Sequence, residues 1–153
     1  IEASGGPGLT STPSTILEWF TLLQTNRLLG LAILGIFETA FFPLGVLMFM
    51  GLYIALRRVS ESLMAIGTAF YFISTAIYFA SNNAFAMLNL SNQYAVATTE
   101  AQRNLLLAAG QAVMATETGT GMVMTFLLGS LAGLIVSIVM LKSKTFGKPV
   151  AII

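Results

Sequence analysis

The sequence predicts an all-α integral membrane protein, built as a bundle of three transmembrane helices with one amphipathic helix on the extracytoplasmic side. Two observations support this class. Of the 153 residues, 56% are hydrophobic and only 8% are charged, well below the roughly 25% that is usual in soluble domains. The apolar residues are also gathered into long runs, as expected of segments that cross about 30 Å of hydrocarbon. The lipid bilayer is therefore the first partner we expect.

The composition also argues against several classes of function. The net charge of +1 provides no cluster of basic residues for nucleic acid. The chain has no Cys, His or Asp, which removes disulfides, zinc sites of the Cys/His type, imidazole ligation of haem and Ser-His-Asp catalysis. We therefore expect no metal, no cofactor and no enzyme, because catalysis would have to rely on Glu38 or Glu117 with hydroxyl groups alone.

The chain divides into a flexible lead-in (1–15), rich in Gly, Pro, Ser and Thr, a single helical membrane domain (16–148) and a short tail (149–153). Because the first residue is Ile1 and not Met, we expect a processed product or a fragment that lacks an N-terminal helix. Residues 14–27 include Trp19 beside charged residues, which suits a short helix at the membrane interface. The alternative is that the first transmembrane helix simply begins earlier.

The first predicted transmembrane helix, 28–56, contains a single charge, at Glu38. A helix that starts at residue 28 places Glu38 about 15 Å inside, close to the middle of the bilayer. A bare carboxylate is costly there, so we expect the neutral acid, pointing toward protein and donating a hydrogen bond. Pro43 cannot donate to the carbonyl of Thr39, which predicts a kink one turn before the proline.

The second predicted helix, 63–80, follows a polar turn in which Ser60 can act as the N-cap. The alternative is that it extends into 81–90, because Asn82 and Asn83 are tolerated near the end of a span. It carries a polar stripe at spacings of three and four residues that offers partners to Glu38: Thr68, Tyr71, Thr75, Tyr78 and Asn82. One interpretation is that these groups only hold helices together. The other is that they line a wet cavity, a proton path or a ligand groove.

Residues 91–119 have too few consecutive apolar residues to cross the bilayer and predict an amphipathic helix lying on the others. Thr99 and Gln102 form a capping box at its start. After a break at 119–121, the third transmembrane helix runs over 122–141. It carries small residues at strict four-residue spacing, a pattern that permits close helix packing either within one chain or between two copies: Gly121, Thr125, Gly129, Gly133 and Ser137.

Basic residues predict the orientation, because short loops rich in Lys and Arg stay in the cytoplasm. Three crossings place Arg27 and Arg103 on one side, and on the other the following residues: Arg57, Arg58, Lys142, Lys144 and Lys148. We therefore expect a plasma-membrane protein with its N-terminus outside the cytoplasm and its C-terminus inside.

Three strings carry a resemblance to a known family: "YIALRRVSESL", "ASNNAFAMLNLSNQYAVATTEAQRNLLLAAGQAVMA" and "GSLAGLIVSIVMLKSKTFGK". Together they resemble the bacterial multi-pass membrane proteins grouped as domain of unknown function 4386, over most of 28–148. Members typically carry further hydrophobic sequence at the N-terminus. The family has no established activity, so the resemblance implies no catalytic or binding residue.

Two functions fit these observations. The first is a helix-packing scaffold or accessory subunit of a membrane assembly, with other membrane subunits or a second copy as partner. The alternative is a small module that binds or transports a proton, an ion or an amphipathic ligand through Glu38 and the polar stripe.

Overall fold

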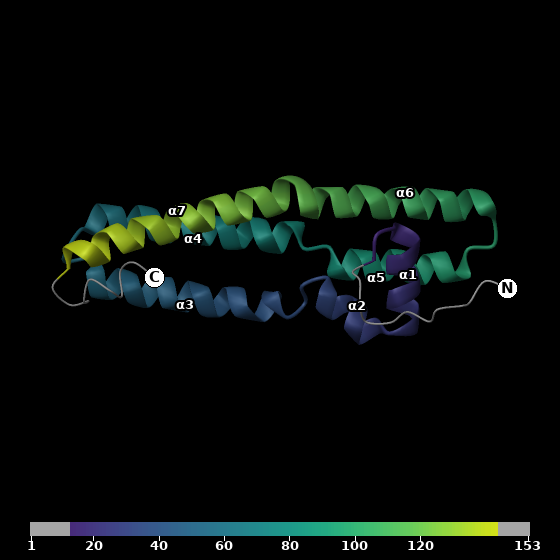
Figure 1. Ribbon diagram of the computed structural model, residues 1–153, viewed down its shortest axis with the longest axis horizontal. Coiled ribbons are helices and arrows are strands. Elements are labelled where there is room, and N and C mark those ends of the chain that lie inside the picture. Colours follow the sequence, from purple (N-terminus) through teal and green to yellow (C-terminus); the bar gives the residue numbers. More distant parts are fainter. Residues whose placement is uncertain (1–12, 144–153) are drawn as a thin grey trace. The chain divides into compact units, whose positions relative to one another are not determined.

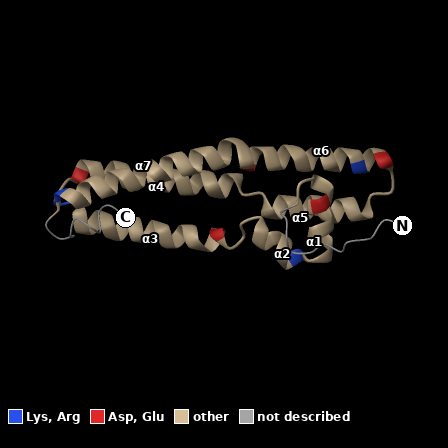
Figure 2. Cartoon of the chain, viewed as in Figure 1, with Lys and Arg blue, Asp and Glu red and all other residues tan. Residues whose placement is uncertain are grey.

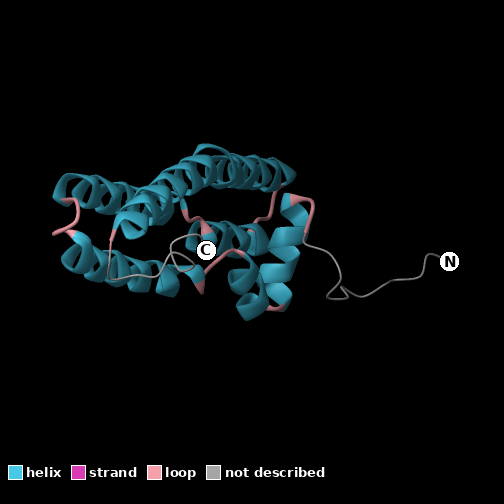
Figure 3. Cartoon of the chain, turned by 60° about the vertical axis from the view of Figure 1, so that its left-hand side comes forward, coloured by secondary structure: helices cyan, strands magenta, loops and turns pink. Residues whose placement is uncertain are grey.

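The structure is a computed structural model that describes residues 13–143 of the chain (Figure 1). The described part consists of helices and loops without a strand (Figure 3), which confirms the all-α class. Three helical stretches are long and apolar enough to cross a membrane: Arg27–Leu56, Glu61–Val96 and Glu100–Lys142. The lead-in up to residue 12, the C-terminal tail, Lys144 and Lys148 lie outside the described residues.

The elements follow one another without long loops. In chain order they are α1 (Ile16–Thr25), α2 (Arg27–Ile33), α3 (Glu38–Leu56), α4 (Glu61–Ser81), α5 (Ala84–Val96), α6 (Glu100–Thr116), a π-helix η1 (Glu117–Gly121) and α7 (Met122–Lys142). They form two compact units. Within the described residues, unit 1 comprises 13–34 and Ala84–Val113, and unit 2 comprises Gly35–Asn83 and 114–143.

In unit 2, α7 packs against α4 in the opposite direction. Gly67 near the start of α4 lies beside Ile135, and Ser81 at the end of α4 lies beside Gly121. α3 packs on the same helix. The core of this unit is a cluster of buried side chains, Phe49, Leu56, Met64, Ala132, Val136 and Val139, so it is built from all three helices.

The three helices of unit 2 match the thickness of a bilayer. They contain 19, 21 and 21 residues, or about 28 to 32 Å at 1.5 Å per residue. Every charged residue in the described part of this unit lies at an end of these helices (Figure 2). Glu38 and Glu117 lie at one end, and Arg57, Arg58, Glu61 and Lys142 lie at the other.

Unit 1 is held together by α1 and α5. Trp19, Phe20 and Leu23 of α1 are buried, and the Ser91 hydroxyl of α5 donates to the Phe20 carbonyl at 3.0 Å. Gly110 of α6 packs against Phe20, with no space for a larger side chain. The helix predicted over 14–27 is therefore a separate element, and the alternative of an earlier start to the first transmembrane helix is wrong.

The predicted continuous helix over 28–56 is also wrong in its first part. The chain leaves the helix after α2, turns through Gly35 at φ 79°, and starts α3 at Glu38. A positive φ is open to glycine because it has no Cβ. Pro43 lies inside α3, so the interruption falls at 34–37 and not one turn before the proline. Glu38 is consequently the first residue of a helix and not the middle of one.

The amphipathic helix predicted over 91–119 is two helices, α5 and α6. The capping box that starts α6 is confirmed, because the Thr99 hydroxyl accepts from the Gln102 backbone N–H at 3.2 Å and the Gln102 side chain accepts from Thr99 N–H at 3.4 Å. Ser60 occupies the N-cap of α4 as predicted, but its side chain makes no capping hydrogen bond. The break predicted at 119–121 is a π-helix, with Gly119 at φ −87° and ψ −112°.

Candidate functional site

The polar stripe of α4 does not act as one surface. Tyr78 and Asn82, at its C-terminal end, reach the region of Glu38. Tyr71 stacks on Phe49 of α3 at 4.0 Å between ring centroids, and its hydroxyl lies over Gly45 of α3. The stripe is thus divided between a polar cluster at one end of unit 2 and aromatic packing further along.

The two threonines of the stripe make no hydrogen bond to Glu38 within the described residues. Thr75 is buried, and its hydroxyl donates to the Tyr71 carbonyl at 2.9 Å. The Thr68 hydroxyl oxygen is buried and has no hydrogen-bond partner within the described residues. Neither threonine is placed to bind Glu38.

The Tyr78 hydroxyl is the centre of the polar cluster. It donates to the Gly35 carbonyl at 3.0 Å and accepts from the Asn82 side chain at 3.3 Å, and the Glu38 carboxylate lies against it. The Tyr78 ring stacks on Phe42 of α3 with centroids 4.0 Å apart. A single side chain therefore connects α4 both to the turn before α3 and to the first turn of α3 itself.

Gly35 is the point on which these groups converge. A Cβ placed on it would lie 3.1 Å from the Tyr78 hydroxyl, 3.6 Å from Oε2 of Glu38 and 3.7 Å from Nδ2 of Asn82. The Thr39 hydroxyl also donates to the Gly35 carbonyl, at 3.5 Å. The positive φ and the crowded surroundings give two independent reasons for glycine at this position.

Glu38 differs from the buried acid that the sequence predicts. Its side chain is exposed, and it occupies the first turn of α3, where backbone N–H groups favour a carboxylate. The predicted position in the middle of a continuous helix is therefore wrong, because the helix starts at this residue.

A second carboxylate, Glu117 of η1, belongs to the same end of unit 2. Its carboxylate lies near the backbone N–H of Asn83 and in the neighbourhood of Glu38. Its Oε2 atom is buried and, within residues 13–143, has no hydrogen-bond partner. The sequence predicts for Glu117 only the role of an acid in a hypothetical enzyme, because a break predicted at 119–121 does not indicate which neighbours the residue beside it meets.

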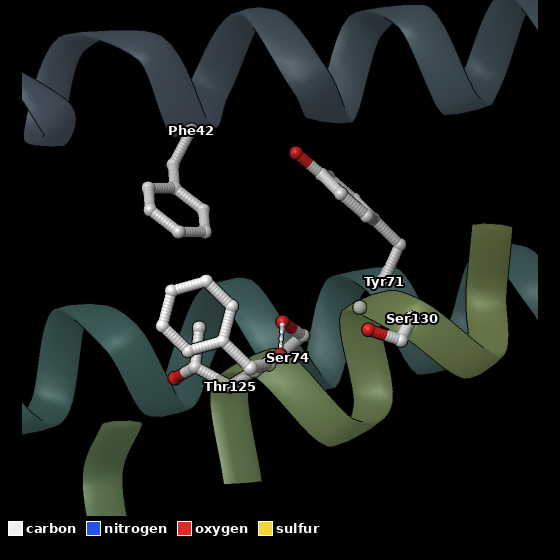
Figure 4. A pocket seen from close by; sticks show the side chains of 7 residues that line it. Phe42, Tyr71, Ser74, Thr125 and Ser130 are labelled. Atoms are coloured by element: carbon white, nitrogen blue, oxygen red, sulfur yellow. Dashed lines mark hydrogen bonds between the residues drawn. The ribbon is translucent and has the colours of Figure 1, made fainter. Parts of the chain in front are cut away.

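A groove of about 260 Å³ opens among α3, α4 and α7 (Figure 4). In this view Phe42 projects from α3, and the Tyr71 side chain of α4 reaches toward α3. The Ser74 hydroxyl donates to the Thr125 carbonyl at 2.8 Å, which joins α4 to α7 beneath the groove. Phe42, Tyr71, Ser74, Thr125, Phe126, Gly129 and Ser130 form its lining.

The small residues of α7 pack largely within the chain. Gly121 lies against Ser81, and a Cβ on Gly129 would lie 3.4 Å from the Ser74 hydroxyl. Thr125 is buried, with its hydroxyl oxygen unpaired among the described groups. Gly133 meets nothing within 4 Å, and Ser137 is half-buried. Most of the predicted seam is therefore occupied by α4.

Neither carboxylate has the surroundings of a metal site. Within the described residues no group of three or more His, Cys, Asp or Glu side chains comes together. The cluster offers hydroxyl, amide and two carboxylate groups, which can bind one another and position helix ends.

Comparison of the chain with protein-family models, with curated proteins and with solved structures finds no match in any of the three. The resemblance to the family of domain of unknown function 4386 therefore stays a prediction. What the fold supports is the class of helical membrane proteins with three candidate spans.

Proposed function

We propose that this chain is a plasma-membrane protein that works as a helix-packing scaffold or accessory subunit and not as an enzyme. Unit 2 supplies three helices of bilayer length with charges only at their ends. The hydrocarbon layer then covers α3, α4 and α7, and the end with Arg57, Arg58 and Lys142 faces the cytoplasm. The other end, which carries Glu38 and Glu117, faces the extracytoplasmic side.

The observation that carries the proposal is the uncovered face of α3. In the 18-residue apolar stretch of the candidate span Arg27–Leu56, only 6% is buried within the protein. The buried share is 22% in each of the other two candidate spans. On its outward face Gly51 meets nothing within 4 Å, and Ala55, one turn later, is also exposed. Small residues four apart allow another helix to approach closely in lipid. Most of the corresponding seam of α7 is occupied by α4, so we take α3 as the helix that binds the partner.

Native mass spectrometry of the chain in lipid nanodiscs tests this function. We expect a defined oligomer or a complex of fixed stoichiometry with another membrane protein, and we expect Gly51→Ile to dissociate it. Gly133→Ile is the matched control, because Gly133 also has open space around it but lies on α7. A strictly monomeric chain without a protein partner would contradict the proposal, and so would equal effects of the two substitutions.

The groove beside Phe42 supports a second candidate function, the binding of one small apolar or amphipathic ligand. Its lining combines aromatic rings with hydroxyl groups, and the proposed placement of α3, α4 and α7 puts it within the hydrocarbon layer. A fatty acid that carries a photoreactive diazirine should crosslink to Phe42 or Phe126. Gly129→Leu should abolish the crosslink by filling the groove, whereas Gly133→Leu should leave it unchanged. Crosslinks spread along all lipid-facing helices would indicate only the surrounding bilayer.

A further inference from the structure

The groove among α3, α4 and α7 contains a hydroxyl group to which the described residues offer no hydrogen-bond partner. Tyr71 of α4 lines the groove, and its side chain reaches toward α3, the helix from which Phe42 projects (Figure 4). Its hydroxyl lies over Gly45, which has no side chain to meet it, and makes no hydrogen bond within residues 13–143. A tyrosine hydroxyl that is removed from water usually has a partner, so one from outside the chain is expected.

The depth of this hydroxyl excludes the ordinary lipid oxygens as that partner. Gly45 is seven residues from the start of α3, and Tyr71 is ten residues from the end of α4, or about 10 and 15 Å along these helices. With unit 2 placed across the bilayer as proposed above, the hydroxyl lies inside the hydrocarbon layer. The ester and headgroup oxygens of phospholipids stay at the surface of that layer, and water is absent within it. The partner is therefore a polar group of a molecule that resides in hydrocarbon.

The lining of the groove also determines the charge of that molecule. The described residues that line it include no Lys, Arg or Glu, and the charged residues of unit 2 between 35 and 143 lie at the helix ends. An ionised group in the groove would have no counter-ion in hydrocarbon. The polar group of the ligand is therefore uncharged, which excludes the carboxylate of a fatty acid.

The Tyr71 hydroxyl is best satisfied by a carbonyl oxygen. The Ser74 hydroxyl already donates to the Thr125 carbonyl at 2.8 Å, and the Thr125 hydroxyl oxygen is itself buried. A ligand carbonyl brings an acceptor and no further hydrogen, whereas a ligand alcohol brings another hydrogen that needs an acceptor. Phe42 and Phe126 add two aromatic rings to the lining, and aromatic rings suit a flat unsaturated ring as neighbour.

We propose that the groove binds an uncharged ring compound with a carbonyl group, of the quinone type, and that the Tyr71 hydroxyl donates to the carbonyl oxygen. The inference rests on the second candidate function, ligand binding in the groove, and gives that ligand a chemical class. Tyr71 is the residue that selects for the carbonyl, and the aromatic rings select for a flat molecule. Binding by itself satisfies the hydroxyl, so no electron transfer is involved.

Infrared difference spectroscopy of the full chain in nanodiscs tests the hydrogen bond. The probe is decylubiquinone with isotope-labelled carbonyl carbons, which separates its carbonyl bands from those of the protein and the lipid. We expect one carbonyl band to move to lower wavenumber when the protein is present. Tyr71→Phe keeps the ring that stacks on Phe49 but removes the donor, so it should return the band to its position in protein-free nanodiscs.

Tyr78→Phe is the matched control. It removes a hydroxyl from the same helix, and each tyrosine stacks on a phenylalanine of α3 with ring centroids 4.0 Å apart, but Tyr78 does not line the groove. We expect the shifted band to persist in this variant. The inference is overturned if the band does not move, if it moves equally in Tyr71→Phe, or if Tyr78→Phe also removes the shift.

Competition with the photoreactive fatty acid separates this inference from ligand binding in general. Decylubiquinone should suppress the crosslink to Phe42 or Phe126, and Tyr71→Phe should raise the concentration for half suppression about tenfold, as expected for the loss of one hydrogen bond. Decylbenzene, which has the ring and tail without a carbonyl, should compete equally in both forms. A crosslink without a carbonyl shift would refute the carbonyl class alone, and the absence of both would refute ligand binding in the groove as well.

Discussion

α3 and α7 are both apolar helices of about 20 residues, both contain glycine and both pack on α4, yet they do so by different means. α7 brings its backbone against α4 through Gly121 and through the Thr125 carbonyl, which accepts from Ser74. α3 contacts α4 through aromatic side chains, because Phe42 stacks on Tyr78 and Phe49 stacks on Tyr71. A backbone contact leaves no space for another side chain, whereas a contact made by rings can adjust. Substitutions at the two seams should therefore differ in cost.

The largest expected effect is at the α7 seam. Gly121→Val places new carbon atoms where Ser81 already lies, and neither backbone can move without breaking the packing of α4 on α7. We expect a loss of about 2 to 3 kcal/mol in the free energy of unfolding, measured by denaturant titration in mixed micelles. Gly133→Val, on the same helix but with open space around it, should cost much less. Equal losses would mean that the α4–α7 seam is looser than the structure indicates.

A smaller loss is expected at the α3 seam. The Cβ of Gly45→Ala would overlap the Tyr71 hydroxyl, but that hydroxyl is the far end of a side chain that can shift on Phe49. We expect a loss of about 1 to 2 kcal/mol in the same titration. Gly51→Ala, on the open face of the same helix, should cause no loss. If Gly45→Ala proved as costly as Gly121→Val, the distinction between backbone and ring contacts would be wrong.

Ser74→Ala isolates the hydrogen bond that accompanies the backbone contact. Ser74 is buried, and its hydroxyl donates to the Thr125 carbonyl at 2.8 Å. Hydrogen bonds between membrane helices contribute about 0.6 kcal/mol on average and up to about 1.7 kcal/mol, so we expect a loss within this range. Ser130→Ala, an exposed hydroxyl of α7, should be neutral. A loss as large as that for Gly121→Val would show that polar contact, and not close packing, stabilises this seam.

The smallest effect is expected at the start of α1 in unit 1. Unlike the effects at the two seams, it depends on pH. Hydrogen bonds from Ser14, and then from Thr15, lower the pKa of Glu18 below its ordinary value of 4.5. Because the folded pKa is the lower one, stabilisation of the start of α1 is present above the unfolded pKa and is lost as the pH falls through the folded pKa. NMR carbon shifts of α1 should show this fraying in acid.

Glu18→Gln keeps an oxygen acceptor but removes the titrating group, so it should abolish the pH dependence of α1. Fraying that persists with the same midpoint in this variant would assign the effect to another group. The capping box between Thr15 and Glu18 predicts that the pH dependence disappears in Glu18→Gln, because no other acid lies in the first turn of this helix.

Part of the candidate site could be predicted from the sequence. Spacings of three and four residues place Tyr78 and Asn82 on one side of α4, and both do meet the region of Glu38. The same spacing grouped Thr68, Tyr71 and Thr75 with them, but helical periodicity specifies a face and not the position along the neighbouring helix. Those three residues lie too far along α4 to contribute to the polar cluster.

The sequence by itself determined the class of protein, the three apolar stretches, the cap of α6 and the gathering of basic residues at one end of unit 2, because each depends on local composition or on hydrogen bonds between near neighbours. The tertiary structure alone decided the break at Gly35 and the position of Glu38 at the start of a helix. The reason is that a positive φ depends on the groups that surround it, here the Tyr78 hydroxyl and the Asn82 amide, which lie more than forty residues away along the chain. Tertiary packing likewise decided which glycine seam is filled and which stays open, since small residues permit a close approach without specifying the helix that makes it.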